Sequence, residues 1–176
     1  MTQKKIIEQL HLAFSDVANT AKLFSEETFF QRPATGKWSV AENAEHLILS
    51  VKPLAGLFGQ PETMLEKWGK TTRPQGNYDK VVAVYLEKVG NVGVGFPSFT
   101  PSNTITSKQE LVDELDAVNN KFLVRASLLT EMELDTYQVP HPLIGMLTCR
   151  EFLYFTHYHT MRHCGTMKQL LGSFEV

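Results

Sequence analysis

The sequence predicts an all-α protein built around a four-helix bundle. Apolar residues recur at three- and four-residue steps in four long segments, two of these segments begin with a helix-capping pattern, and no segment of comparable length alternates as a strand does. A chain of 176 residues, with 43% hydrophobic and 20% charged residues, is long enough to bury such a core. We therefore expect one domain covering residues 1–176.

The first two helices are predicted from their apolar faces and from a capping pattern. The face of the first helix consists of Ile6, Leu10, Phe14, Val17, Ala21 and Phe24. The second helix is expected to begin at Ser39, because Ser39 and Glu42 have the spacing of a capping box, in which each side chain accepts a bond from a free backbone N–H. The core face of this helix consists of Val40, Ala44, Leu47, Val51 and Leu54. Pro53 lacks an N–H and is expected to kink or end it.

Residues 56–106 are predicted to form a long crossover between the second and third helices. The segment holds seven of the eleven glycines and four of the eight prolines, and it has too few periodic apolar positions for a core of its own. Within it, the stretch YDKVVAVYLEKV (78–89) is compatible with a short helix. The crossover is long enough to traverse the bundle.

The third helix is predicted to follow Ser107, which forms a second capping pattern with Glu110. Its core face consists of Leu111, Leu115, Val118, Phe122, Ala126 and Leu129. The fourth helix is predicted over residues 148–172. Because the connections between helices 1 and 2 and between helices 3 and 4 are short, each of these pairs is expected to pack as antiparallel neighbours.

Composition and charge limit the expected partners and compartment. A formal net charge of −2 gives no electrostatic reason to expect nucleic acid or an anionic membrane, so neither is predicted as a partner. No stretch approaches the roughly 20 apolar residues of a membrane helix. Cys149 and Cys164 lack the spacing of a disulfide framework, which indicates reduced thiols and a cytoplasmic protein.

Three of the six histidines lie within two turns of the predicted fourth helix: His157, His159 and His163. An α-helix turns about 100° per residue, so His159 and His163 lie only about 40° apart and face inward with Phe152 and Met167. By the same arithmetic, His157 lies about 200° from His159, on the other flank. The helix therefore carries one inward pair and one odd histidine.

The inward pair is compatible with buried structural histidines, a solvated polar stripe or metal ligands. Two buried imidazoles without partners would each cost about 1–3 kcal/mol, and a divalent cation that binds both lone pairs removes this cost. The i, i+4 spacing presents both rings to one ion. His46 lies at the edge of the apolar face of the second helix and is a candidate third ligand. Three histidines without a fixed fourth ligand describe an open site of the catalytic type.

Other polar residues near these histidines receive no catalytic role. Glu42 lies one turn before His46, where orienting that histidine is an alternative to capping. Trp38 is interpreted as a packing anchor at the start of the second helix. The residues interpreted as rim, surface, loop or packed side chains are His11, His141, Tyr154, Tyr158, Arg162 and Cys164.

Two stretches carry a resemblance to a known family. Residues 37–47 (KWSVAENAEHL) resemble the W-S-x-x-E-x-x-x-H-L signature of the DinB-like (DinB/YfiT-like) superfamily of metalloenzymes, and residues 141–171 resemble its last helix, with H-x-x-x-H. The resemblance implies a four-helix bundle of up-down-down-up topology. It also implies a divalent metal held by His46, His159 and His163. His157 and the long crossover are outside the family pattern.

The resemblance implies a metal-dependent enzyme for a small-molecule substrate, of the hydrolase or thiol-dependent transferase type. Zinc or nickel is the expected metal, before iron or manganese, and a low-molecular-weight thiol is a candidate second cofactor. Catalytic residues are not predicted, and no general base stands out beside the three histidines. The alternative is a non-catalytic metal-binding or interaction module with a structural or vestigial site. We also predict a homodimer, because relatives are often dimeric and Ile48 and Leu49 extend the apolar surface beyond the core face.

Overall fold

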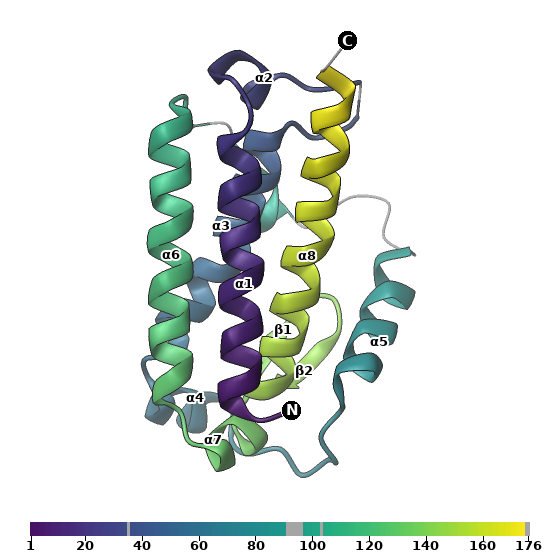
Figure 1. Ribbon diagram of the computed structural model, residues 1–176. Helices are drawn as coiled ribbons and strands as arrows, with labels where there is room; N and C mark the ends of the chain where they lie inside the picture. The colour runs from purple at the N-terminus through teal and green to yellow at the C-terminus, as the bar shows by residue number, and fades with distance from the viewer. Residues whose placement is uncertain (35, 91–96, 103, 175–176) are drawn as a thin grey trace.

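The computed structural model describes residues 1–34, 36–90, 97–102 and 104–174, and four long helices dominate it (Figure 1). These helices are α1 (Gln3–Lys22), α3 (Val40–Leu57), α6 (Lys108–Leu128) and α8 (Cys149–Phe174). Figure 1 shows α1 and α8 running in one direction and α3 and α6 in the other, which confirms the all-α bundle and its up-down-down-up topology. No helix among the described residues is long and apolar enough to span a membrane.

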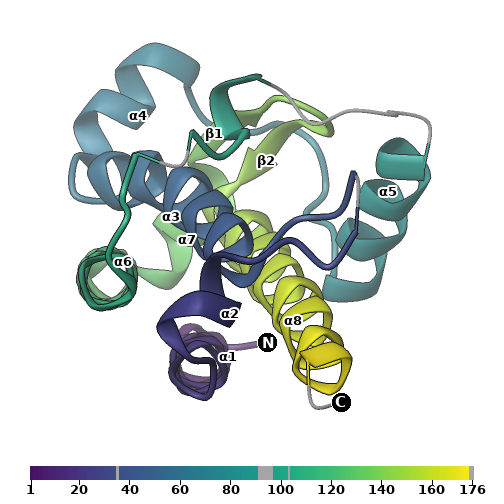
Figure 2. The same cartoon turned by 90° about the horizontal axis from the view of Figure 1, so that it is seen from above.

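The packing of the four helices differs from the predicted neighbour pairs. Helix α1 packs on α8 and α6, and α3 packs on the same two helices, so α1 and α3 lie diagonally across the bundle (Figure 2). The prediction that α1–α3 and α6–α8 are neighbours is therefore wrong. The connections contain folded elements, α2 (Glu26–Phe30) in the first and α7 (Glu131–Thr136) in the second, and so are long enough to span the diagonal.

The predicted apolar faces form the core. Every core position predicted on the four long helices is buried, including Phe14, Leu47, Leu115 and Met167. Ser39 and Glu42 form the full predicted capping box, whereas Ser107 caps α6 by accepting a bond from the Glu110 amide. Pro53 does not end α3, which continues to Leu57 and buries Leu54 and Ala55 beyond the proline. The periodicity thus predicted the core better than the helix boundary.

The crossover contains more structure than the sequence predicts. The expected short helix is present as α5 (Tyr78–Gly90), and it packs against α8 (Figure 1). Helix α4 (Pro61–Trp68) and the 3₁₀ turn η1 (Pro97–Phe99) were not predicted. Residues 91–96, which belong to the predicted crossover, lie outside the described part of the chain.

A short antiparallel hairpin, also not predicted, precedes α8. Its strands β1 (Gln138–His141) and β2 (Gly145–Thr148) pair with Val139 opposite Leu147, and both of these residues are buried. Gly145 adopts a φ of 81°, a left-handed conformation that glycine enters at low cost. Strands of four residues are too short to produce a recognisable alternation in the sequence.

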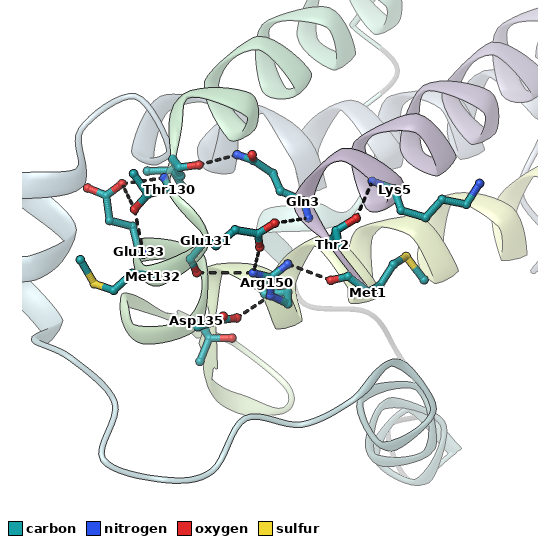
Figure 3. A network of polar contacts seen from close by, with 12 residues as sticks. Met1, Thr2, Gln3, Lys5, Thr130, Glu131, Met132, Glu133, Asp135 and Arg150 are labelled. Carbon is teal, nitrogen blue, oxygen red and sulfur yellow. Dashed lines mark hydrogen bonds and ion pairs between the residues drawn. The ribbon is translucent and has the colours of Figure 1, made fainter.

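A buried arginine at the start of α8 joins the N-terminus to α7 at the base of the bundle (Figure 3). Arg150 is 4% exposed; it forms ion pairs with Glu131 and Asp135 and donates to the Met1 carbonyl at 3.0 Å. Glu131 also accepts from the Gln3 amide at 2.9 Å. The positive charge and the hydrogen-bond donors of Arg150 are thereby satisfied within the chain.

Candidate metal centre

Three histidines from two helices converge inside the bundle. His46 on α3 and His159 and His163 on α8 each present a ring nitrogen, and these ligand atoms all lie within 4.8 Å of one another. The Nε2 atoms of His46 and His159 are 3.1 Å apart. The structure thus brings together the three residues that the sequence selected, and the group has the composition and spacing to hold one metal ion.

Hydrogen bonds on the far side of two rings orient them toward this common point. His46 Nδ1 lies 2.7 Å from the Phe99 carbonyl oxygen, and His163 Nδ1 lies 2.8 Å from Asn43 Oδ1. Because both partners are acceptors, each Nδ1 carries the proton and donates it. The lone pair of each ring then resides on Nε2, the tautomer that suits a metal ligand.

Asn43 is the orienting residue that the sequence interpretation missed. It is 1% exposed, and its own amide group is fixed by a bond from Nδ2 to the Ser39 carbonyl at 2.8 Å. Glu42, weighed as an alternative, closes the capping box and forms an ion pair with Arg32. The only signal for Asn43 is its position one turn before His46 on the same helix.

The three imidazoles are held in their neutral form. Burial, with the nearby charges of His46 and Arg162, lowers the pKa of His163 from 6.5 to about 3. Burial and the neighbouring histidines lower the pKa of His159 well below 6.5, and burial lowers that of His46. At neutral pH the three rings therefore keep their lone pairs available.

Aromatic side chains enclose the three histidines. The Trp38 ring stacks on His163 with centroids 6.1 Å apart, and the Phe155 ring stacks on His159 at 5.1 Å. Tyr85 from α5 meets His159 edge-on at 6.0 Å. Trp38 is thus a packing residue, as predicted, but it packs on the candidate ligands themselves. The crossover contributes to the site through Tyr85 and the Phe99 carbonyl.

A cavity of about 790 Å³ opens onto the three histidines. Its walls come from α3, α5, α8 and the hairpin, and most are apolar, as at Leu54, Val139 and Phe152. His141 also lines it, which corrects the surface-or-loop interpretation. The amides of Leu143 and Ile144 donate to His141 Nδ1 at 3.1 and 3.3 Å, so the proton of the neutral ring resides on Nε2. Burial lowers the pKa of His141 to about 4.

Among the remaining candidate residues, only Arg162 lies in the cavity beside the three histidines. His157 lies on the other flank of α8, as the helical projection predicts, and its Nδ1 is 3.0 Å from the Tyr78 hydroxyl. His11 is exposed on α1. Cys149 and Cys164 are both buried and unpaired, and burial raises the pKa of Cys149 to about 12. Arg162 is exposed, as the rim-or-surface interpretation expected, and it also lines the cavity beside His163.

Most of the sequence matches the model of one protein family. The model of the DinB superfamily matches residues 9–167. The chain belongs to the DinB superfamily. A relative, the uncharacterized protein YuaE of Bacillus subtilis (strain 168), is 24% identical over 157 residues, which cover 89% of this chain and 91% of YuaE. The predicted family resemblance is thereby confirmed.

Solved structures share the fold at low sequence identity. A conserved protein from Enterococcus faecalis superposes with a TM-score of 0.64 and 14% identity, covering 97% of this chain and 95% of that one. YfiT from Bacillus subtilis superposes with a TM-score of 0.61 and 13% identity, covering 96% of this chain and 85% of YfiT. YfiT is described as a probable metal-dependent hydrolase with an unusual four-helix bundle topology. At such identities the likeness establishes the fold alone.

A third structure corrects the predicted absence of a nucleic-acid partner. The colibactin self-resistance protein ClbS, crystallised with double-stranded DNA, has a TM-score of 0.60 and 14% identity, covering 96% of this chain and 94% of ClbS. The exclusion was wrong because it rested on a net charge of −2, and overall charge does not describe a local surface.

The basis given for a homodimer is also corrected in part. Ile48, expected outside the core, is 5% exposed and packs inside the bundle. It offers no surface to a second copy of the chain, so the homodimer stays a prediction based on the family resemblance.

Proposed function

We propose that His46, His159 and His163 bind one divalent transition-metal ion and that the site is catalytic. The supporting observation is the convergence of three neutral imidazoles at the floor of a cavity, two of them oriented through Nδ1 by Phe99 and Asn43. Such a site suits zinc or nickel before iron or manganese, because imidazole nitrogen is a borderline-soft ligand. The proposed activity is that of a metal-dependent enzyme of the hydrolase or thiol-dependent transferase type.

The donor set and the cavity both fit this proposal. Three protein ligands leave further coordination positions for a small molecule, as in catalytic rather than structural metal sites. A bound ion would supply Lewis acidity toward a substrate oxygen or sulfur. The description of YfiT as a probable metal-dependent hydrolase supports the same reaction class.

The residues of the chain supply orientation, shielding and hydrogen-bond donors. Asn43 and the Phe99 carbonyl hold two rings in the ligand tautomer. Trp38 and Phe155 cover the rings and restrict access of water. His141 Nε2–H is a donor in the cavity wall, and its low pKa makes it a poor general base at neutral pH.

Metal analysis and turnover assays together test the proposal. The untagged protein is purified, its metal content is measured by mass spectrometry, and the loaded protein is assayed with thiols, electrophiles, esters, amides and double-stranded DNA. DNA is included because ClbS was crystallised with it. We expect one ion per chain and turnover that a chelator abolishes.

Two outcomes would change the conclusion. One bound ion without turnover of any substrate favours the alternative, a non-catalytic metal-binding or interaction module. A protein that takes up no ion from zinc or nickel solutions contradicts the metal site itself. A cytoplasmic homodimer remains a further prediction, which light scattering and cell fractionation test.

A further inference from the structure

The cavity beside the three histidines carries positive charge that its own walls do not neutralise. Lys37 and Arg162 line it, and none of the lining residues in the described part of the chain is Asp or Glu. If the proposed function holds, a divalent ion on three neutral imidazoles adds two further positive charges. Although Lys37 and Arg162 are exposed to solvent, a cavity with this charge balance favours an anionic occupant.

Arg162 is the cation best placed to bind such an anion. Its Nη1 donates to the Tyr85 hydroxyl at 3.0 Å, and its guanidinium carbon lies 5.9 Å from the centre of the Tyr85 ring. Tyr85 is itself 6% exposed, so the guanidinium rests on a fixed support at the mouth of the cavity. A guanidinium has five N–H donors, and this contact uses one of them.

The other arginines of the described chain are engaged differently. Arg32, Arg73 and Arg150 each form an ion pair with a carboxylate, and Arg125 donates to the Gly59 carbonyl. Arg162 has no carboxylate partner among the described residues. Arg125 also lacks a carboxylate partner among the described residues, but only Arg162 of the two lines the cavity and can pair with a group bound there.

The shape and lining of the cavity define the rest of the ligand. A volume of about 790 Å³ lies within the range of cavities that enclose small organic molecules. Leucine, valine, proline and phenylalanine make up 13 of its 27 lining residues. A small inorganic anion would leave this apolar surface uncovered, whereas an organic anion would satisfy both the charge and the walls.

We propose that the cavity binds an organic carboxylate with an apolar body, and that Arg162, supported by Tyr85, binds the carboxylate. This assignment rests on the proposed function, because it concerns the substrate class of the same site. Arg162 selects the ligand by forming paired N–H···O bonds with it, a geometry that an ammonium group does not reproduce.

Calorimetric titration of the full-length protein with octanoate tests the assignment. We expect octanoate to bind the metal-loaded protein. Octan-1-ol and octylammonium, which lack the carboxylate, should bind at least tenfold more weakly, and acetate should bind more weakly because it lacks an apolar body. Arg162→Gln should weaken octanoate binding about tenfold, the usual effect of losing a charge-assisted hydrogen bond. Tyr85→Phe should weaken it about threefold, because it removes the hydroxyl that accepts from Arg162 and keeps the ring beneath the guanidinium. Circular dichroism checks that both variants remain helical.

A matched control and a metal-free titration separate the possible failures. Lys168→Gln removes one positive charge from the same helix, where Lys168 pairs with Asp16 outside the cavity, and should leave octanoate binding unchanged. Octanoate binding that is equal in Arg162→Gln and wild type, or matched by octylammonium, overturns the carboxylate assignment. A third outcome separates the two proposals. If the protein takes up no metal, but the chelator-treated wild type binds octanoate more tightly than chelator-treated Arg162→Gln, the metal proposal fails and the carboxylate assignment stands.

Discussion

At the start of α8, Arg150 is surrounded by groups that satisfy it, whereas further along the same helix Arg162, His159 and His163 face a cavity. Arg150 pairs with two carboxylates and a backbone carbonyl (Figure 3). The two histidines present ring nitrogens to a shared space. Both regions place polar groups in or beside the apolar core.

The difference lies in where the partners come from. A buried polar network whose donors and acceptors are all matched within the chain holds elements together and has nothing left to offer a ligand. A group of neutral imidazoles with convergent ring nitrogens, beside a cation without a carboxylate partner among the described residues, keeps groups available for a ligand. We infer that the base of α8 serves stability and its middle serves binding, and the variants below test that division.

The largest effect is expected from the three histidines. Replacing His46, His159 or His163 by Ala removes one of three protein ligands, so metal occupancy should collapse while circular dichroism stays helical, because a chain of this length folds without the ion. The control is His157→Ala. The His157 ring contacts the Tyr78 hydroxyl on the other flank of α8, so its removal should leave metal occupancy intact. Metal analysis that finds full occupancy in all four variants refutes the three-histidine site.

Arg150→Ala should produce the largest loss of stability. It removes two ion pairs and the bond to the Met1 carbonyl from a buried position, and we expect a loss of about 2 kcal/mol in the free energy of unfolding. Urea denaturation measures this loss. Lys168→Ala, which breaks an exposed pair with Asp16, should cost less than about 1 kcal/mol. If Arg150→Ala lowered metal affinity as strongly as His159→Ala, the two regions would not be separate.

Asn43→Ala tests whether Asn43 orients His163 for metal binding. The change frees His163 Nδ1 from its acceptor, so the ring loses its fixed orientation and tautomer, and metal affinity should fall about tenfold. A competition assay with a chromophoric chelator measures the affinity. Asn43→Asp retains an acceptor at this position and should bind metal more tightly than Asn43→Ala. If both variants bound the metal as tightly as the wild type, Asn43 would have no orienting role.

A further prediction concerns the stability of the metal-free protein at low pH. The pKa values of His163 and His141 are lowered in the folded state to about 3 and about 4, from 6.5. Below pH 6.5 the unfolded chain binds protons that these folded residues do not, so the stability should decline as the pH falls, down to about pH 4 for His141 and about pH 3 for His163.

Denaturation of the metal-free protein at several pH values measures this decline. His163→Ala should flatten the curve, whereas His11→Ala, at an exposed position, should not change it. A wild-type curve that is flat between pH 6.5 and pH 4 would mean that burial does not keep these imidazoles neutral.

The sequence by itself determined the parts of the protein that depend on local spacing. Apolar residues at helical steps predicted the four long helices and their buried faces, because a helix sets which residues share a face regardless of its partners. The four-residue spacing of His159 and His163 likewise fixed them on one side of α8 and placed His157 on the other. The capping box of Ser39 and Glu42 is also local, and it was predicted correctly.

Tertiary structure alone decided which helices are neighbours and which groups complete the site. Helices α1 and α3 lie diagonally across the bundle because the connection between them, which contains α2, is long enough to cross it. The contacts of Phe99 with His46 and of Tyr85 with Arg162 join residues 53 and 77 positions apart in the chain, and the first uses a backbone carbonyl that every residue possesses. No local pattern encodes such contacts, because they form only when distant segments pack against the same helices.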